Sequence, residues 1–358
     1  MAVFKVSENI IIQEFFNFMS SVGITPKYNF EPILDGRTHR FATDEDRGNS
    51  KSGAYYIHAD GFINFGAMDF HRHSEMQKGS ISRDYFPEYD KTQYEKAIEE
   101  SRRRAAERAR QDREKEATAR LQMMKEFTTY DKERRVVICS DLNTGYENHA
   151  YLKQKGVAEL VQNGMNFRVK KHQTSLNDFS HVGDLLIPLV HIESGYSSCI
   201  EDRMRGLQII SGRLNHEGKY QKSFYKDVPC QGCYCELIPY QCRGDNFFSD
   251  KVRIIFICEG VATGLSLLAL TDFNSPVLCA MSCHNFMTIA KAWRGKLNKH
   301  FHGFFKNVQI IIAADYDYSG LGVKKAQEVI EAGYAAEKIV PPVIGQDFND
   351  YYLTTRRA

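Results

Sequence analysis

The C-terminal third of the chain alternates short apolar runs with segments of helical periodicity. The apolar runs have the length of buried strands, and in the segments between them apolar residues recur about every three to four positions. In chain order these strands and helices read RIIFIC, GLSLLALTD, PVLCAM, FMTIAKAW, QIIIAA, GLGVKKAQEVIEAG and KIVPPVI. Strands that are apolar throughout need cover on both faces, so the alternation predicts a mainly parallel sheet between two layers of helices.

Polarity changes abruptly in the middle of the chain. Residues 91–127 consist mainly of Glu, Arg, Lys, Ala and Gln without Gly or Pro, which predicts one long solvated helix. Its interleaved charges favour a connector with internal salt bridges, with phosphate binding as the alternative. We therefore expect a small N-terminal α/β module (1–85), this charged helical connector (86–132), an α+β segment (133–247) and a C-terminal α/β domain (248–358).

The composition is that of an ordinary globular protein. The 358 residues are 42% hydrophobic and carry a formal net charge of +2, so a nucleic-acid partner would be contacted by local basic clusters. The N-terminus has no signal-peptide pattern, and no run reaches the roughly 18 apolar residues of a membrane-spanning helix. We expect a cytoplasmic protein with no membrane partner.

Acidic residues stand where two of the expected strands end. Glu259 follows IIFIC, and Asp315 and Asp317 follow QIIIAA. Because side chains alternate along a strand, Asp315 and Asp317 face the same side, with Cα atoms roughly 6 to 7 Å apart. Open α/β sheets bind ligands at the carboxyl ends of their strands, and carboxylate oxygens suit Mg²⁺ or Mn²⁺. The sequence predicts a metal site here, with helix capping as the alternative role of each acid.

The segments EGVATGLSLLAL and AADYDYSGLG resemble the signature motifs of the TOPRIM domain, which DnaG-type primases, topoisomerases and some nucleases share. The resemblance makes Glu259, Asp315 and Asp317 the catalytic and metal-binding residues. A third segment, GQDFND, is similar to an acidic motif of primases and suggests Asp347 as a further metal or nucleotide contact. The resemblance to TOPRIM also implies a Rossmann-like fold with a mainly parallel sheet for residues 248–358.

Segments before these motifs resemble, in their order, the region that precedes TOPRIM in phage and plasmid DNA primases. They read HAYLKQKGV, GDLLIPLVHIESG, GLQIISGRL, GKYQKSFY and GCYCEL. The resemblance implies an α+β primase subdomain over 133–247, in which Arg213, Lys219 and Lys222 bind nucleotide and template.

The activity that this resemblance implies is that of a DNA primase. Such a nucleotidyltransferase is a DNA-directed RNA polymerase that makes short primers for DNA replication on single-stranded DNA from ribonucleoside triphosphates. The chain has no GxxxxGK[ST] loop, so a replicative helicase would act in trans.

Two other functions remain open at this point. A TOPRIM nuclease or topoisomerase-like strand breaker would use the same acids, and the strand breaker would add a nucleophilic tyrosine on a separate domain. With 19 tyrosines in the chain, the sequence leaves that possibility standing. A non-catalytic nucleic-acid-binding regulator is the third alternative.

Four of the nine cysteines crowd into one short segment: Cys230, Cys233, Cys235 and Cys242. Four thiolates in a turn-rich segment are a possible Zn²⁺ site, with His216 as a substitute ligand. Zinc sites usually consist of two well-separated CxxC pairs, and Cys235 lies very close to Cys233. Ordinary thiols are therefore the favoured interpretation.

Overall fold

The computed structural model describes residues 6–27, 30–46, 48, 50–59, 63–73, 75–81, 91–128, 130–131, 136–137, 148–162, 164–171, 173, 175–176, 178–194, 199–244, 247–300 and 307–357. The chain folds as two units, Met1–Arg113 and Glu114–Ala358, which we describe separately. The long charged helix α2 (Lys91–Phe127) has the bounds that its composition predicts and contributes residues to both units. None of the helices in these residues combines the length and apolarity that crossing a membrane requires.

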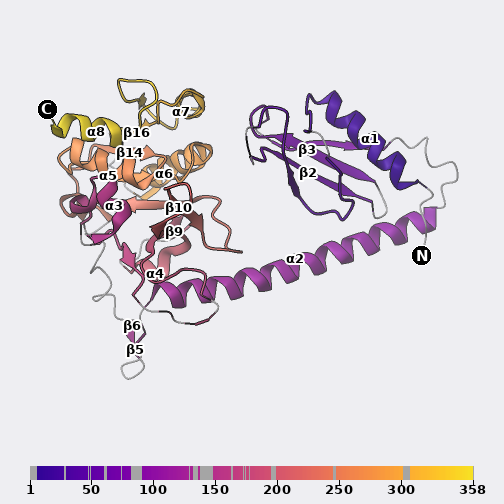
Figure 1. Ribbon diagram of the computed structural model, residues 1–358, viewed down its shortest axis with the longest axis horizontal. Helices are drawn as coiled ribbons and strands as arrows, with labels where there is room; N and C mark the ends of the chain where they lie inside the picture. The colour runs from indigo at the N-terminus through magenta and orange to yellow at the C-terminus, as the bar shows by residue number, and fades with distance from the viewer. Residues whose placement is uncertain are drawn as a thin grey trace. The chain divides into compact units, whose positions relative to one another are not determined.

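The N-terminal unit is an antiparallel sheet with one helix packed on it (Figure 1). The helix α1 (Glu8–Ser21) begins after Ser7, whose hydroxyl accepts a hydrogen bond from the Ile10 N–H and so caps the first turn. The sheet pairs its strands in the order β1 (His39–Phe41), β2 (Gly53–His58), β3 (Asn64–Asp69) and β4 (Gln77–Ser80). Phe15 of α1 and Tyr55 and Phe65 of the sheet meet in its core.

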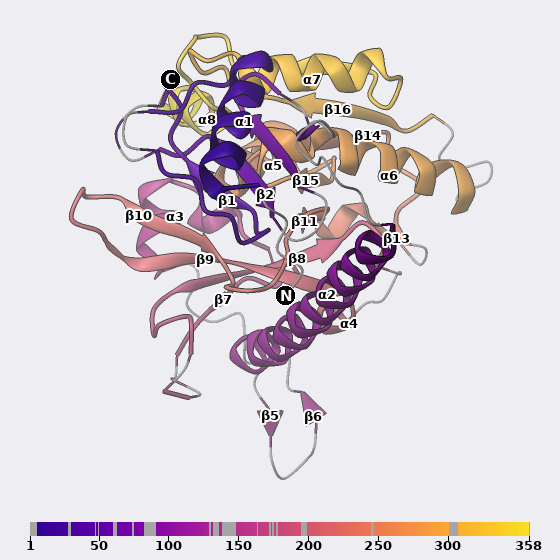
Figure 2. The ribbon, with the colours of Figure 1, turned by 90° about the vertical axis from the view of Figure 1, so that its right-hand side faces the viewer.

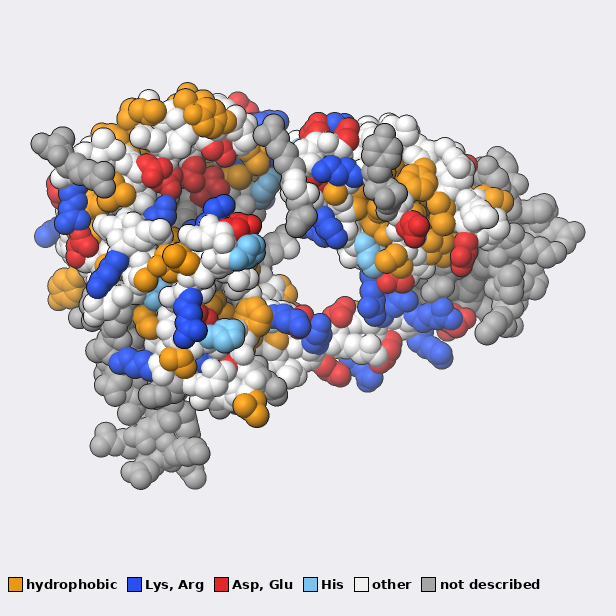
Figure 3. Space-filling view, viewed as in Figure 1, with side chains coloured by type: hydrophobic (Ala, Val, Ile, Leu, Met, Phe, Trp, Pro, Cys, Tyr) orange, Lys and Arg blue, Asp and Glu red, His pale blue; other side chains and the backbone are white. Residues whose placement is uncertain are grey.

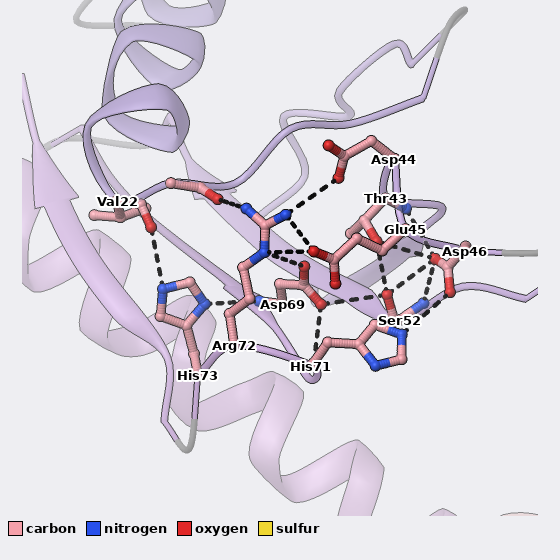
Figure 4. A network of polar contacts seen from close by, with 11 residues as sticks. Val22, Thr43, Asp44, Glu45, Asp46, Ser52, Asp69, His71, Arg72 and His73 are labelled. Atoms are coloured by element: carbon pink, nitrogen blue, oxygen red, sulfur yellow. Dashed lines mark hydrogen bonds and ion pairs between the residues drawn. The ribbon is translucent and has the colours of Figure 1, made fainter. Parts of the chain in front are cut away.

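A buried carboxylate fastens the loop after β1 to the start of β2 (Figure 4). Asp46 Oδ2 accepts hydrogen bonds from the backbone N–H groups of Thr43 and Ser52, each 2.8 Å long, and from the Ser52 hydroxyl at 2.9 Å. Burial alone would raise the pKa of Asp46, but the hydrogen bonds from Ser52 and Thr43 hold it well below its usual range. Asp46 is therefore ionised, and its hydrogen bonds hold the loop after β1 against the start of β2.

The same network reaches the end of α1 through the turn after β3 (Figure 4). Asp69 accepts a hydrogen bond from the Ser52 hydroxyl at 3.3 Å. Arg72 binds Glu45 at 2.5 Å and the Gly23 carbonyl at 2.6 Å. The network therefore joins the end of α1, the loop after β1, the start of β2 and the turn after β3. Besides carboxylates, hydroxyls and one guanidinium, it contains the imidazoles of His71 and His73.

The C-terminal unit contains a nine-stranded mixed sheet. Its strand order is β10-β9-β8-β11-β15-β14-β16-β17, and β7 pairs with β8. The strands are β7 (Arg168–Val169), β8 (Leu185–His191), β9 (Met204–Leu214), β10 (Tyr220–Phe224), β11 (Cys233–Leu237), β14 (Ile254–Cys258), β15 (Val277–Cys279), β16 (Gln309–Ala313) and β17 (Glu337–Ile339). The last four pair in parallel with one another, and the others pair antiparallel.

Short elements complete this unit. The hairpins are β5 (Tyr130–Asp131) with β6 (Val136–Val137), and β12 (Arg243–Gly244) with β13 (Phe247–Phe248). The 3₁₀ turns are η3 (Ala158–Leu160), η4 (Tyr240–Cys242) and η5 (Cys283–Asn285). The helices are α3 (Ala150–Gln154), α4 (Ile200–Arg203), α5 (Val261–Leu270), α6 (Phe286–His300), α7 (Leu321–Glu331) and α8 (Phe348–Arg357).

Two hydrophobic cores lie on opposite faces of this sheet. Alternate residues of β14 enter them, with Ile255 and Ile257 in the core shared with α6 and α7, and Phe256 and Cys258 in the core shared with α5 and α8. Figure 2 shows α6 and α7 beside β14 and β16. The predicted α/β class and the mainly parallel C-terminal sheet are therefore confirmed. The sheet also continues into the antiparallel strands of residues 185–237, which the sequence patterns do not reveal.

The C-terminal end of α2 is fixed in this unit by a buried ionic cluster. Lys170 Nζ lies 3.1 Å from Glu126 Oε2 and 2.7 Å from Asp178 Oδ2. Glu126 Oε1 accepts hydrogen bonds from the Tyr225 hydroxyl at 2.5 Å and the Phe179 N–H at 2.9 Å. Breaking such a pair would leave a buried charge uncompensated. The predicted segment boundaries at 85 and 132 lie outside the described residues, and the four-segment division remains a proposal.

We predict that Asp46→Asn destabilises the N-terminal unit by about 2 to 3 kcal/mol, because several hydrogen bonds to a buried charge are weakened together. The pKa of Asp46 is lowered on folding, so this stability is present at neutral pH and is lost as the pH falls below about 4. The variant should lack that acid-dependent part. Circular dichroism of urea unfolding at several pH values measures both effects.

Asp44→Asn is the matched control, because Asp44 stands in the same turn and is nearly half exposed. Its effect should stay within about 0.5 kcal/mol. The only tryptophan, Trp293, is buried in the C-terminal unit, so its fluorescence reports unfolding of that unit alone. A shift of the Trp293 transition in Asp46→Asn would contradict a local role for the network.

Candidate metal-binding carboxylate site

Two acids of the candidate site, Glu259 and Asp315, lie just beyond the ends of β14 and β16. These strands pair in parallel with Cys258 opposite Ala313, so both strands end at the same edge of the sheet. Glu259 is the next residue after β14, and Asp315 follows β16 by two residues. This edge is formed by the carboxyl ends of parallel strands, where α/β proteins place their ligands.

Glu259 is held in position from two sides. Its Oε2 accepts a hydrogen bond from the Cys283 N–H of η5 at 3.2 Å. A Cβ atom at Gly322 would lie 2.8 Å from Oε1, so any side chain at this position would displace the Glu259 carboxylate from where it lies against the start of α7. Burial and the nearby charge of Asp317 raise the pKa of Glu259, and the hydrogen bond from Cys283 opposes the shift.

Asp315 lies at the centre of the negative charge. Its Oδ1 is buried and has no hydrogen-bond partner among the described residues. Burial, followed by repulsion from Glu259, Asp347 and Asp317 and then Asp350, raises the pKa of Asp315 to about 7. A carboxylate so placed needs either a proton or a cation.

Asp317 and Asp347 also accept hydrogen bonds that stabilise the chain where α7 and α8 begin. Asp317 Oδ1 accepts hydrogen bonds from the Ser319 hydroxyl at 2.8 Å and the Gly320 N–H at 3.0 Å, just before α7. Asp347 Oδ1 accepts from the Asp350 N–H at 2.8 Å, at the start of α8, and Asp350 returns the bond at 3.2 Å. Asp347 therefore caps α8, whereas Asp317 stabilises the turn before α7, whose N-cap is Gly320 without a side-chain cap. The hydrogen bonds to Oδ1 leave the other carboxylate oxygen of each residue available.

Sequence reasoning assigned no role to Asp350, Gly322 or the Cys283 N–H. Asp350 adds to the charge around Asp315 and completes the cap of α8. The spacing of Asp347 and Asp350 before a helix is a signal that could have found it. The part played by Gly322 depends on how closely α7 approaches Glu259, and no local pattern encodes that distance.

The donors at this edge suit a hard divalent cation. Glu259, Asp315 and Asp317 supply carboxylate oxygens, and the unsatisfied Asp315 Oδ1 marks the position that lacks positive charge. The described residues contain no group of three or more His, Cys, Asp or Glu side chains already arranged to hold an ion. An ion here would have few direct protein ligands, with water and phosphate oxygens completing the shell, as is common for Mg²⁺.

One of the three predicted basic residues lies close to the carboxylates. Lys222 of β10 is attracted to Asp347 and Asp315, while the protein around it lowers its pKa by desolvation. Its Nζ also lies 5.0 Å from the centre of the Tyr151 ring. All three predicted basic residues, Arg213, Lys219 and Lys222, are exposed, and Lys219 lies 3.6 Å from Glu217. Figure 3 shows acidic side chains gathered on this unit with basic side chains beside them.

The family of Toprim domains matches residues 254–358, from the first residue of β14 to the end of the chain. This segment is a Toprim domain. The match includes all the acids described above, and it confirms the TOPRIM resemblance found in the sequence.

Among solved structures, the chain is similar to several primases. The primase fragment of the bacteriophage T7 primase-helicase protein is 14% identical, with a TM-score of 0.35 over 57% of this chain and 69% of that one. The E. coli primase catalytic core is 13% identical, with 0.36 over 58% and 69%. The zinc-binding and RNA polymerase domains of the Aquifex aeolicus primase are 14% identical, with 0.36 over 97% and 81%. Such low TM-scores carry no argument about activity. No curated protein sequence matches the chain.

The four clustered cysteines lie in different parts of this fold. Cys233 and Cys235 are in β11 and point into the core that contains α5, whereas Cys242 points into the core on the other face of the sheet. Cys230 packs against the α5 side as well. All four are free thiols, and burial raises the pKa of Cys230, Cys233 and Cys242. The sheet between Cys242 and the others prevents these four residues from surrounding one zinc ion.

We predict that Asp315→Asn stabilises the metal-free C-terminal unit at pH 8 by about 2 kcal/mol, after allowance for solvent screening. The folded pKa of Asp315 lies above the unfolded value, so wild-type stability falls as the pH rises from about 4 through about 7. The gain from the substitution should shrink toward pH 4. Trp293 fluorescence during urea unfolding measures it.

Saturating Mg²⁺ should cancel the gain, because a bound cation stabilises only the wild type. Glu337→Gln, which removes an exposed acid of β17, is the control and should behave like wild type. A variant that is less stable than wild type at pH 8 would show that Asp315 has a structural role.

Proposed function

We propose that this protein is a DNA primase, which synthesises short RNA primers on single-stranded DNA by Mg²⁺-dependent nucleotidyl transfer. The observation that carries the proposal is the partly buried, mutually repelling carboxylate cluster of the Toprim domain, together with the cationic Lys222 that interacts with Asp347 and Asp315. A triphosphate with its metal ions complements both charges. A site for neutral substrates would need neither the carboxylate cluster nor the cationic side chain.

The proposed reaction joins two ribonucleotides. The 3′-hydroxyl oxygen of one attacks the α-phosphorus of the other, the hydroxyl loses its proton, and pyrophosphate leaves. Bound Mg²⁺ would supply charge neutralisation at the attacking and leaving oxygens. Glu259, Asp315 and Asp317 would hold the ions, and Asp347 would add a further contact.

Side chains of the protein would act as general base and bind the phosphates. Glu259 is the candidate general base, because its raised pKa makes it a better proton acceptor than an ordinary carboxylate. The Cys283 N–H orients it through Oε2. Lys222 would bind the triphosphate, where its charge is drawn toward the carboxylates and their metal-bound substrate. Arg213 and Lys219 would contact phosphates farther out.

The partners follow from this chemistry. Single-stranded DNA is the template and ribonucleoside triphosphates are the substrates. The chain lacks a phosphate-binding GxxxxGK[ST] loop, so we propose that a replicative helicase supplies the single strand in trans. We place this activity in the cytoplasm, in the replication of a phage or plasmid.

Primer synthesis tests the proposal directly. The wild type should incorporate labelled ribonucleotides on single-stranded templates in the presence of Mg²⁺. Glu259→Gln, Asp315→Asn and Asp317→Asn should each lower kcat by at least about a hundredfold, because the amides keep the volume but lose the charge that holds metal. Glu337→Gln should retain full activity.

Other products would identify another activity. Strand cleavage without synthesis would favour the nuclease, and a covalent tyrosine–DNA product would favour the topoisomerase-like strand breaker. Full primer synthesis by Asp315→Asn would remove this residue from the site.

The basic residues are tested by kinetics. Lys222→Ala should raise the apparent KM for ribonucleotides about tenfold, because one charge-assisted contact is lost, and it should leave Mg²⁺ binding intact. Lys219→Ala is the matched control, since Lys219 belongs to the same hairpin but pairs with Glu217, whereas Lys222 interacts with Asp347 and Asp315. Its effect should be about threefold or less. Equal effects of the two substitutions would contradict a special role for Lys222.

A further inference from the structure

An exposed aromatic ring stands directly beside the carboxylate site. Tyr318 follows Asp317 in the chain, and 82% of its surface is accessible to solvent. Two residues lie between Asp315 and Tyr318, so their Cα atoms are at most about 11 Å apart. The hydrogen bonds of Asp317 do not involve this ring, and nothing in the proposed chemistry uses it.

The ring of Tyr318 rests on the backbone of Gly345. A Cβ atom at Gly345 would lie 3.1 to 3.4 Å from three atoms of the Tyr318 ring and hydroxyl. Gly345 has a φ of +89°, which side-chain-bearing residues rarely adopt. The glycine therefore permits both the turn and the close approach, and the outer face of the ring stays open to solvent.

The two segments that form this platform are fastened together. The Tyr316 N–H donates to the Gln346 carbonyl at 3.0 Å, and the Gly345 N–H donates to the Tyr316 carbonyl at 2.6 Å. Two prolines, Pro341 and Pro342, restrict the segment that leads to Gly345. The ring is thus presented on a fixed support.

Further apolar side chains extend the platform. Val343 and Ile344 precede Gly345 and have about half of their surfaces exposed, at 53% and 47%. In Figure 3, hydrophobic side chains gather along the upper edge of the C-terminal unit, near the acidic group. Single exposed apolar residues are common, but here three lie on two joined segments at the edge of a nucleic-acid site.

We propose that Tyr318, with Val343 and Ile344, is a stacking platform for an unpaired base of the single-stranded polynucleotide whose phosphates reach the carboxylate site. The inference rests on the proposed function and adds to it a residue that positions the strand. Aromatic rings bind single strands in this way because every base presents a flat face.

The platform suits a polynucleotide better than a free ribonucleoside triphosphate. A triphosphate requires cationic side chains, and Tyr318, Val343 and Ile344 supply none. Lys222, which is drawn to Asp347 and Asp315, is the cation that meets this need. The apolar side chains of the platform are then available to contact the bases of a strand whose phosphate backbone is bound at the carboxylate site.

Binding of a labelled single-stranded oligonucleotide to the full chain, measured by fluorescence anisotropy with Mg²⁺ present and ribonucleotides absent, tests the platform. Tyr318→Ala should weaken binding about five- to a hundredfold, the loss expected for one stacked base. Tyr318→Phe should bind within about twofold of wild type, because stacking uses the ring and not the hydroxyl. Gly345→Ala should weaken binding although the tyrosine remains, because a methyl group there displaces the ring.

Tyr240→Ala is the matched control. Tyr240 is 80% exposed, and the turn that contains it contacts Asp272 and Phe273, beyond the end of α5 that is farther from Glu259. Its removal should not change affinity. The apparent KM for ribonucleotides should also be unchanged in Tyr318→Ala. Unaltered Trp293 fluorescence during unfolding shows that each variant is folded.

Each outcome separates this inference from the proposed function. Primer synthesis with DNA binding that does not depend on Tyr318 would overturn the platform and leave the primase standing. Binding that depends on Tyr318 without primer synthesis would support the platform and remove the primase. An increased KM for ribonucleotides with unchanged DNA affinity would overturn the platform as a strand contact and assign Tyr318 to the nucleotide.

Discussion

The parallel register between β14 and β16 governs the candidate site. Residues 254–258 pair one for one with residues 309–313, and along both strands alternate side chains enter opposite cores. A shift of one residue would turn every apolar side chain of one strand into the wrong core, so the register is strongly specified. Because it is, Glu259 and Asp315 emerge at the same edge with the same spacing in every folded molecule.

That rigidity explains how the fold tolerates so much unbalanced charge. The acids gather at the end of strands whose own residues are buried on both faces, and the repulsion between them raises the pKa of Asp315 to about 7. Separating the charges would require the two strands to part. The apolar layers around α5 and α6 oppose this, so the protein keeps an electrostatically unfavourable arrangement ready for a cation.

Local sequence patterns were sufficient for the parts of the fold that depend on neighbouring residues. The alternation of strands and helices after Arg253, the long helix and the positions of Glu259, Asp315 and Asp317 all follow from periodicity. The continuation of the sheet through β11 depends on an antiparallel pairing with β15, between residues forty positions apart, and no local pattern reports it.

The sequence patterns also could not predict the distances between side chains. Lys222 could not be distinguished from Arg213 and Lys219, because only the packing around Tyr151 brings one of these cations close to the acids. The sequence favoured ordinary thiols for the clustered cysteines but could not predict that Cys242 and Cys233 enter different cores. The Asp46 network joins residues from separate segments, and no sequence motif predicts it.

The ionic cluster at the end of α2 determines where the C-terminal unit can begin. Lys170 is buried and shares Glu126 with Tyr225 and with the turn at Phe179. A fragment that begins at residue 133, after the helix, would lack Glu126, one of the two carboxylates paired with this lysine. It would also lack Met123 and Phe127, which belong to the same core as Trp293. The last turns of the charged helix are therefore part of the C-terminal unit, and a fragment of this unit should begin no later than Glu114.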